Sequence, residues 1–478
     1  MMPDAGDAGV GDGGRNDANV IGVDAGSDSG VRPDAGRAAL CTGTGCNVVA
    51  IEALSATTCV LRANGQVDCW GRGQNGELGD GAMHHTDECR QTPELNVDCS
   101  RDAVTVALPH PAERLFSRGS AQMCARLVTS HEIWCWGGLI YQLGSTLAHA
   151  MYAPEHVLVN GTGVADGTSS YTTSYGVACW VNADTSASCL GFGSAGRLGY
   201  NNFADSSVPV TPLLPSGSGP ILGVIEIETN GPMSCARTAS HLYCWGSNQF
   251  GQLGVAPPHQ SCGTGSTHYD CTPLAVEVTG VNAATIVDME LDGDYTCVLH
   301  STGHMQCWGL GASGGLGNAD INSTHTPVEP IGISNVAEMR IANGATCAML
   351  HDGTVWCWGA GDLGQMGDGV MAHNLPACTA LADQTSCAAN ALCNWTGTTC
   401  RQKPCVDEGG SLFDCQLTPV QVTGITDAVH LAAGSHYLCA LRASGQIWCW
   451  GESLRYQLGN EMRPTPAYAP VMSIALGS

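Results

Sequence analysis

The sequence predicts an all-β protein, a seven-bladed β-propeller with four-stranded blades and disulfide-stapled loop insertions. Two observations predict this fold. A hairpin-length unit with a cysteine at each end recurs seven times between about residue 47 and the end of the chain. Glycine is abundant, with 63 residues, and only 13% of residues are charged, a composition that suits short strands and tight turns better than surface helices.

The first segment, residues 1–46, is separate from the repeats. Asp, Ala and Gly recur in it, with almost no aromatic or large apolar residue, so it cannot bury enough surface to offset the entropy lost on ordering. We expect a disordered Asp/Ala/Gly-rich tether here and the propeller over residues 47–478. Cys41 and Cys46 close the tether and could form one small disulfide.

Each unit of the propeller region begins as a β-hairpin. In residues 59–69 apolar and polar residues alternate around Asn64-Gly65, a hairpin turn signal that places Cys59 opposite Cys69. This is the separation that a cross-strand disulfide needs. The seven blade pairs are Cys59 with Cys69, Cys124 with Cys135, Cys179 with Cys189, Cys235 with Cys244, Cys297 with Cys307, Cys347 with Cys357, and Cys439 with Cys449.

The second cysteine is followed by Trp-Gly in six units and by Leu190-Gly191 in the third, then by G-x-x-G-x-L-G or a degenerate form and by an extended stretch. Since neighbouring side chains of a strand point to opposite faces, Trp and Cys cover the two faces of each blade. We therefore expect these tryptophans to pack between blades and not to form a sugar-binding array. They are Trp70, Trp136, Trp245, Trp308, Trp358 and Trp450.

This succession of Cys-Trp-Gly, G-x-x-G-x-L-G and Pro-Val resembles the repeat of the regulator of chromosome condensation family, in a bacterial, disulfide-bearing version. The resemblance covers residues 47 to about 475 and implies a seven-bladed propeller. The histidine that many members carry before the inner strand is replaced by Tyr295 and Tyr437 in two units, and the third unit lacks its Trp. Because of these departures, the family's ligands or partners are less safely inferred for this chain than the family's fold.

Insertions fall mainly between the Leu-Gly signal and the next extended stretch, and the largest is a cysteine-rich insertion at about 370–415. Three insertions carry an extra cysteine pair each: Cys89 with Cys99, Cys262 with Cys271, and Cys405 with Cys415. A further set with open connectivity is Cys378, Cys387, Cys393 and Cys400. Disulfides restrict the unfolded ensemble of such loops and reduce the entropy lost on binding.

The loops around 80–101, 255–272 and 368–418 are therefore the predicted recognition surface, and equivalent loops of a propeller emerge on one face. The alternative is that they are tolerated insertions, stapled against proteolysis. Binding residues expected on these loops are His84, His85, His268, Tyr269 and Trp395.

The chain has 26 cysteines and no C-x2-C pair, so disulfides in an oxidising compartment are a better interpretation than zinc ligands. We expect an extracellular or surface-tethered protein. No signal peptide is visible at Met1 to Gly14, and we expect that the true start lies upstream or that a leader was removed. No run of 18 apolar residues indicates a transmembrane helix.

The net charge of −25, with Lys403 as the single lysine, argues against nucleic acid as a partner. The G-x-G-x-x-G match at Gly71–Gly76 recurs from Gly191, Gly309 and Gly359, so it indicates turns that need glycine and not a dinucleotide site. We expect no cofactor, no metal site and no catalytic residues. Asp292 and Asp294 lie beside a turn and are expected to face solvent there.

The function predicted is a monomeric, non-catalytic binding scaffold for an unknown protein or surface glycan. A second hypothesis is a propeller-based carbohydrate-active enzyme, a lyase or glycosidase, which needs acid and base groups that converge at the ring centre or in a loop-rimmed pocket. A third, remote hypothesis is guanine-nucleotide exchange, which the family resemblance implies and which the disulfides and acidity disfavour.

Overall fold

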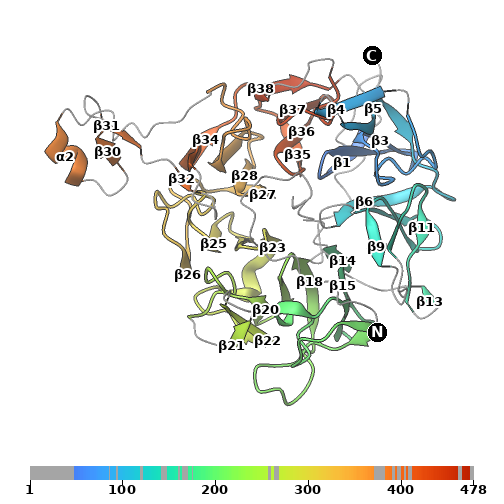
Figure 1. The fold of residues 1–478 in the computed structure, drawn as a ribbon, viewed down its shortest axis with the longest axis horizontal. Coiled ribbons are helices and arrows are strands. Elements are labelled where there is room, and N and C mark those ends of the chain that lie inside the picture. The colour runs from blue at the N-terminus through green and yellow to red at the C-terminus, as the bar shows by residue number, and fades with distance from the viewer. Residues whose placement is uncertain are drawn as a thin grey trace.

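In the computed structural model the strands form seven antiparallel sheets arranged as the blades of a ring (Figure 1). The residues described are 48–85, 87–92, 95–118, 122–141, 148–159, 162–163, 171–174, 176–256, 260–262, 268–370, 383–389, 393–395, 400–402, 405–406, 412–460 and 466–473. The predicted seven-bladed propeller is confirmed. Residues 1–46, with Cys41 and Cys46, lie outside the described part, so the tether stays a prediction.

Each blade is one continuous stretch of chain whose first strand is innermost. Blade 1 contains β1 (Val48–Leu54), β2 (Thr57–Arg62), β3 (Val67–Arg72), β4 (Asp87–Thr92) and β5 (Leu95–Thr105). Blade 2 contains β6 (Ala112–Arg118), β7 (Gln122–Leu127), β8 (Ile133–Trp136) and β11 (Glu155–His156). Blade 3 contains β14 (Tyr171–Ser174), β15 (Val177–Val181), β16 (Ala187–Gly191) and β17 (Ser206–Val210).

Blade 4 contains β18 (Val224–Asn230), β19 (Met233–Thr238), β20 (Leu242–Ser247), β21 (Gln260–Cys262) and β22 (Tyr269–Glu277). Blade 5 contains β23 (Ile286–Leu291), β24 (Tyr295–His300), β25 (Met305–Gly309) and β26 (Thr324–Val328). Blade 6 contains β27 (Val336–Ala342), β28 (Ala345–Leu350), β29 (Val355–Ala360) and β34 (Cys415–Gln421). Blade 7 contains β35 (Ala428–Ala433), β36 (Tyr437–Arg442), β37 (Ile447–Gly451) and β38 (Ala467–Met472).

Short elements lie between these strands. The two-stranded sheets pair β9 (Leu139–Tyr141) with β10 (Ala148–Ala150), β12 (Leu158–Val159) with β13 (Thr162–Gly163), β30 (Cys393–Trp395) with β31 (Cys400–Gln402), and β32 (Cys405–Val406) with β33 (Leu412–Phe413). The helical turns are η2 (Ser194–Gly196), η3 (Ala283–Thr285) and α2 (Gln384–Ala389). Helix α2, with β30 and β31, stands outside the ring beside blade 6 (Figure 1).

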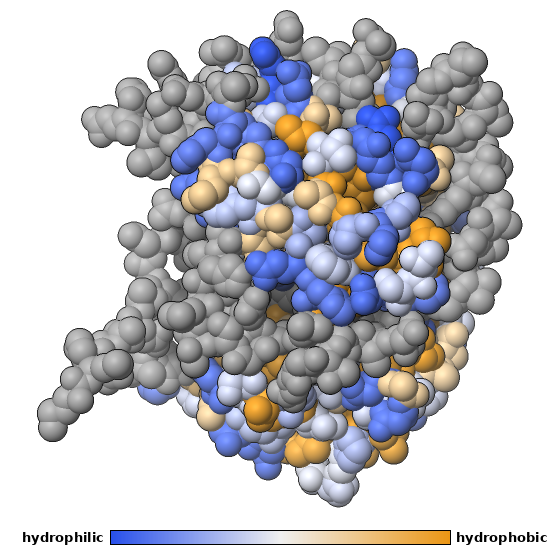
Figure 2. Space-filling model, turned by 90° about the vertical axis from the view of Figure 1, so that its right-hand side faces the viewer, coloured by the Kyte–Doolittle hydropathy of each residue, from blue (hydrophilic) through white to orange (hydrophobic). Residues whose placement is uncertain are grey.

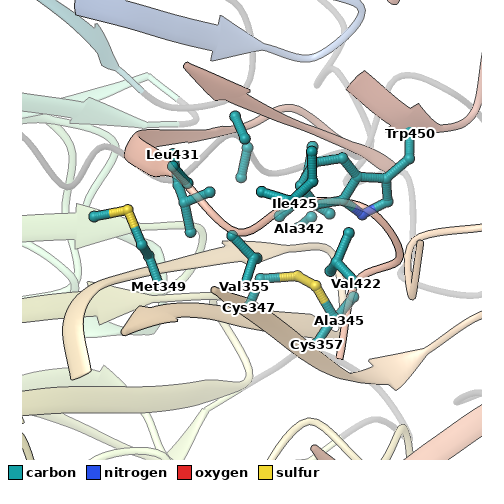
Figure 3. Packing of buried hydrophobic residues seen from close by; sticks show 14 of the residues in the cluster. Ala342, Ala345, Cys347, Met349, Val355, Cys357, Val422, Ile425, Leu431 and Trp450 are labelled. Atoms are coloured by element: carbon teal, nitrogen blue, oxygen red, sulfur yellow. A yellow bond between two sulfur atoms is a disulfide. The ribbon is translucent and has the colours of Figure 1, made fainter. Parts of the chain in front are cut away.

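The seven blade disulfides join residues that lie directly opposite each other on the second and third strands, for example Cys59 and Cys69. Their Cα–Cα distances are 4.0–4.1 Å. Each disulfide packs against the following blade, and each Trp packs against the preceding blade. Between blades 6 and 7, Trp450 meets Val422 and Ile425 in the cluster that contains Cys347 and Cys357 (Figure 3).

The tryptophans also connect the blades by hydrogen bonds. Each indole Nε1 donates to the carbonyl that precedes Leu-Gly, or its equivalent, in the preceding blade, at 2.8–3.1 Å. The donor and acceptor residues are Trp70 and Gln457, Trp136 and Glu77, Trp245 and Arg197, Trp308 and Gln252, Trp358 and Gly315, and Trp450 and Gln365. The G-x-L-G motif thus supplies the carbonyl that accepts the hydrogen bond from the next blade's tryptophan.

The last glycine of that motif is needed for the same contact. At Gly79 φ is +66°, and an added Cβ would lie 2.5 Å from Trp136 Cδ1. A side chain there is excluded both by the left-handed backbone and by the indole. In blade 3, which lacks the Trp, Leu190 and Trp180 fill the interface with Phe116 of blade 2.

The ring closes by packing of blade 7 against blade 1, and the two blades share no strand. The Tyr437 hydroxyl donates to the Thr57 carbonyl at 2.7 Å and lies 2.9 Å from Thr58 Oγ1. Thr58 Oγ1 and Trp70 Nε1 both donate to the Gln457 carbonyl. The closing junction therefore uses the same tryptophan contact as five of the internal junctions. The first and last blades each contain all four of their strands.

Candidate functional site

Three cysteine-stapled hairpins widen blades 1, 4 and 6 at their outer edge. We call them the rim hairpins: β4–β5 (Asp87–Thr105), β21–β22 (Gln260–Glu277) and residues 405–421, which include β32, β33 and β34. Two of the staples are the disulfides Cys262–Cys271 and Cys405–Cys415, with Cα–Cα distances of 5.9 Å. Cys99 is also in a disulfide.

All three rim hairpins join their blades at the same register. The second cysteine pairs with the residue that follows the Trp-Gly glycine, in the pairs Cys99–Arg72, Cys271–Ser247 and Cys415–Ala360. The carbonyl of the aspartate before it accepts a backbone hydrogen bond, in the pairs Asp98–Gly73, Asp270–Asn248 and Asp414–Gly361. Because the register is shared, the hairpins leave the ring at the same edge, where the third strand of a blade turns into the fourth.

The side chain of His85 fixes the start of the first rim hairpin. Its Nδ1 lies 2.7 Å from Asp98 Oδ2 and its Nε2 lies 3.0 Å from Asp80 Oδ2, while its backbone N donates to Asp98 Oδ1. Burial opposes protonation of the ring, but the hydrogen bonds that the ring makes to the Asp98 and Asp80 carboxylates outweigh it and raise the pKa of His85. His85 therefore orders the hairpin, and its ring nitrogens are engaged within the chain.

The other predicted binding residues lie on separate hairpins. His84 is exposed beside His85 on blade 1. On blade 4, His268 is exposed, with its Nδ1 3.2 Å from Ser261 Oγ, and Tyr269 is half-buried in β22. Trp395 ends β30 in the insertion of blade 6, and its side chain lies outside the described part. These residues come from three blades and do not form one cluster among the described contacts.

Several predicted cysteines are not described. Cys378 and Cys387 side chains lie outside the described residues, as do the side chains of Cys89, Cys393 and Cys400. None of the cysteines in the described part is free. In the same part, no group of three His, Cys, Asp or Glu side chains is placed to hold a metal ion, and no helix there is long and apolar enough to cross a membrane.

The inner strands carry a second feature, which the sequence interpretation missed. Glu52, Glu228, Glu290 and Arg340 occupy one repeat position, directly opposite the first blade cysteine. Asp288 and Glu338 lie two residues before Glu290 and Arg340 on the same face of their strands. We call these six residues the central acidic cluster, and each is 0–5% exposed.

Arg340 is the cation of this cluster. Its Nη2 lies 2.6 Å from Glu338 Oε1, and its Nη1 lies 3.5 Å from Glu290 Oε1 and 3.9 Å from Asp288 Oδ2. Burial opposes the charged form of Arg340, but the carboxylates of Glu338, Glu290, Glu52 and Asp288 outweigh it and raise the pKa of Arg340. One guanidinium thus faces more carboxyl groups than it can neutralise.

Burial raises the pKa of three glutamates of the cluster. It raises the pKa of Glu52 to about 7, and those of Glu228 and Glu290 well above their ordinary value of 4.5. Asp292, at the turn after β23, is 4% exposed, accepts a hydrogen bond from Gly344 N at 2.8 Å, and has its pKa raised to about 7 by burial. The expectation that Asp292 faces solvent was wrong, because the turn packs against the next blade.

Hydrogen bonds also connect the turns between first and second strands of neighbouring blades. Asn230 Nδ2 donates to the Leu291 carbonyl at 2.6 Å, Asn343 Nδ2 lies 2.6 Å from His436 Nε2, and Ser435 N donates to the Ser55 carbonyl at 2.9 Å. In an antiparallel blade these turns lie on the same side of the ring as the rim hairpins. On the side of the ring that carries the rim hairpins, hydrogen bonds thus connect neighbouring blades near the centre.

Comparison with known proteins gives the same fold and repeat. The model of the regulator of chromosome condensation (RCC1) repeat matches residues 48–77 and 428–457, the first three strands and the following turn of blades 1 and 7. The chain carries RCC1 repeats. The two RCC1 matches meet at the junction that closes the ring.

Two curated relatives are 25% identical in sequence. The human E3 ubiquitin-protein ligase HERC2 matches over 273 residues, 56% of this chain and 5% of the ligase. The ultraviolet-B receptor UVR8 of Arabidopsis thaliana matches over 254 residues, 53% of this chain and 51% of the receptor. The match therefore spans about half of the plant receptor and a small part of the ligase.

Solved structures share the propeller. Prp20p from Saccharomyces cerevisiae, described with its binding properties to Gsp1p and histones, has a TM-score of 0.59 at 15% identity, covering 86% of each chain. Human WBSCR16 has a TM-score of 0.58 at 16% identity, covering 85% of this RCC1-repeat chain and 93% of its own. At these identities the likeness shows the fold alone.

Proposed function

We propose that the chain is a non-catalytic binding scaffold, extracellular or tethered to the cell surface, that recognises a protein or glycan through its rim hairpins. The observation that carries this proposal is the common register of three stapled hairpins on blades 1, 4 and 6. They stand two or three blades apart, so a partner that spans the ring can contact all three. Disulfide staples keep such loops ordered before binding and so lower the entropic cost of recognition.

Disulfides support the extracellular location, because reducing cytosols keep thiols free. A thiol count on the full chain under denaturing, non-reducing conditions tests this part. We expect almost no free thiol among the 26 cysteines. Many free thiols would contradict the extracellular proposal while leaving the fold unchanged.

Protein binding also agrees with the use of this fold elsewhere, since Prp20p is described with Gsp1p and histones and in a complex with Kap60. Those partners do not transfer to this chain at 14–15% identity. On the side of the molecule seen in Figure 2, polar and apolar residues are interspersed.

The enzyme hypothesis is less well supported by the same geometry. Acidic groups do converge at the ring centre, but Glu52, Glu228 and Glu290 are each no more than 5% exposed. A substrate cannot contact carboxyls that are buried in this way, and general acid–base catalysis needs that contact. The burial of the central acidic cluster thus supports a structural role for it more than a catalytic one.

The single lysine of the chain offers a direct test. Lys403 lies in the sequence between β31 and β32, within the blade 6 insertion, so an amine-reactive photo-crosslinker labels this insertion selectively among the side chains. The matched control carries Lys403→Arg and His351→Lys, because His351 is exposed on the turn at the opposite edge of the same blade.

Both labelled proteins are incubated with the medium and surface fraction of the source organism, and cross-linked products are identified by mass spectrometry. We expect one partner to be captured from Lys403 and not from position 351. Replacement of residues 406–414, within the blade 6 rim hairpin, by a short turn should abolish its binding. Equal capture from both positions, or unchanged binding after the replacement, would overturn the proposal.

A further inference from the structure

Among the described residues, acidic groups outnumber basic groups at the ring centre, and this imbalance has a consequence for the whole ring. The acidic groups that face one another there come from blades 1, 4, 5 and 6: Glu52, Glu226, Glu228, Asp288, Glu290 and Glu338. The basic groups that face them are Arg114, Arg237, Arg340 and His430. Fully ionised carboxylates at this density would repel one another strongly in a medium of low dielectric constant.

We propose that the central acidic cluster is a proton-dependent lock, which holds the inner strands together while its carboxyls are protonated and loosens them as the pH rises. The lock goes beyond partner binding and does not depend on it. Its parts are side chains of four different blades, so its state affects the junctions between them.

Glu228 is the clearest member of the lock. The charged groups that act on it are all acidic: Glu290, Glu226 and Asp288. Arg237, the cation on the adjacent strand, is 3.0 Å from Glu226 Oε2 and is engaged there. One oxygen of Glu228 accepts a 3.4 Å hydrogen bond from Leu291 N, and the other has no hydrogen bond. An ionised Glu228 would therefore be a buried charge with no cation of its own.

Glu290 and Glu52 extend the lock across the centre. Glu290 is fully buried, and its carboxyl has no hydrogen bond although Arg340 Nη1 is 3.5 Å away. Arg340 is shared with Glu338 at 2.6 Å. Glu52 accepts a 3.3 Å hydrogen bond from Ser117 Oγ of blade 2. Protonation of these carboxyls lowers the net negative charge that is buried at the ring centre.

The direction of the pH effect follows from linkage. Burial raises the pKa of Glu52 to about 7 and those of Glu228 and Glu290 well above 4.5. Between pH 4.5 and these raised values the folded chain holds more protons than the unfolded chain, so the free energy of unfolding falls as the pH rises. The lock is fully closed near pH 4.5, weakens through pH 7 and weakens further above it.

Two substitutions in the full chain should have opposite effects. Glu228→Gln replaces a carboxyl that faces only acids by a neutral amide of the same shape. We expect the unfolding temperature of this variant to match the wild type at pH 5 and to exceed it by several degrees at pH 8.5. Glu338→Gln removes the closest partner of Arg340 and should lower the unfolding temperature at both pH values.

The matched control is Glu277→Gln, since this carboxyl is half exposed at the blade edge, with His241 Nε2 3.9 Å away. Its pH profile should follow that of the wild type. Hydrogen exchange at the backbone N of Leu291, which donates to Glu228, gives a second measurement if Glu338→Gln does not fold. We expect faster exchange at Leu291 at pH 8.5 after correction for intrinsic rates.

The proposal is overturned if Glu228→Gln and the wild type have parallel profiles from pH 5 to pH 8.5. It is equally overturned if the corrected exchange rate at Leu291 does not change with pH. Either result would mean that protonation of the cluster does not control the packing of the inner strands in this range. Both experiments use the protein without a partner, so their results do not depend on whether the rim hairpins bind one.

Discussion

At the scale of single residues, the repeat motif is explained by one contact between neighbouring blades. The Trp after the second cysteine donates its Nε1 hydrogen to the carbonyl before Leu-Gly of the preceding blade, and its ring covers the glycine of that Leu-Gly. A side chain at this glycine would meet the indole, and the positive φ already disfavours one. The motif recurs along the chain because each copy packs against the next blade.

Gly367 and Gly369 allow this to be measured, since both lie in one loop with φ of +64° and +84°. An added Cβ at Gly367 would lie 2.8 Å from Trp450, whereas none of the surrounding atoms lies within 4 Å of one at Gly369. We expect Gly369→Ala to cost about 1 kcal/mol for the backbone and Gly367→Ala about 2–4 kcal/mol, because overpacking adds to it. Chemical denaturation measures both, and equal losses would contradict the role given to the indole.

At the scale of the hairpin, disulfides serve two different purposes. The blade pairs lie inside the junctions between blades and belong to the apolar clusters there, as Cys235 and Cys244 do. The rim pairs staple loops at the outer edge, and Cys262 and Cys271 are an example. Both of these pairs are separated by nine residues, so they restrict the unfolded chain equally.

Replacing each pair by alanines therefore separates packing from chain entropy. We expect Cys262→Ala with Cys271→Ala to cost no more than about 2–4 kcal/mol, the loop-closure contribution. Cys235→Ala with Cys244→Ala should cost about 1–3 kcal/mol more, because it leaves a cavity between blades 4 and 5. Thermal unfolding compares the two, and limited proteolysis should cut the rim variant first within its hairpin.

At the scale of the whole molecule, the ring is held closed by one non-covalent junction that resembles the internal ones. Tyr437 connects blade 7 to Thr58 of blade 1, and Tyr295 connects blade 5 to Thr346 of blade 6 through the same hydroxyl contact at 2.9 Å. Burial raises the pKa of both tyrosines, so both hydroxyls keep their protons. The two junctions differ in that only the second is also joined by the chain.

Tyr437→Phe and Tyr295→Phe form a matched pair for the closing junction. Each removes one buried hydroxyl and should cost about 1–3 kcal/mol. Only Tyr437→Phe should increase hydrogen exchange at the backbone N of Ser435, which bonds to Ser55 across the junction. Increased exchange at Ser435 in both variants would show that the ring does not open first at its ends.

The sequence predicted the fold because its strongest signals are local and repeated. Cysteines nine to eleven residues apart around a turn determine a hairpin, and seven hairpins with Trp-Gly determine the blades. The central acidic cluster was missed because its members are scattered over four blades. Four of them, Glu52, Glu228, Glu290 and Arg340, lie seven residues before the first cysteine of their own blade. Only the closed ring brings residues of separate blades together.

The rim hairpins were predicted as insertions, but not their common geometry. An Asp-Cys pair at 98–99, 270–271 and 414–415 was the available signal. It was overlooked because the insertions differ in length and sequence elsewhere. His85 illustrates the limit of a residue-type argument, since two aspartates of its own hairpin region engage both of its ring nitrogens.

The hairpin location of the blade disulfides has a consequence for how the protein matures. Each bond joins neighbouring strands of one hairpin, 9–11 residues apart. A nascent chain that enters an oxidising compartment can therefore form each bond as soon as that hairpin emerges, before any cysteine of a later blade is present. Sequential oxidation of this kind avoids the many mispairings open to 26 thiols. If the chain is exported as proposed, it can then mature without extensive disulfide reshuffling by isomerases.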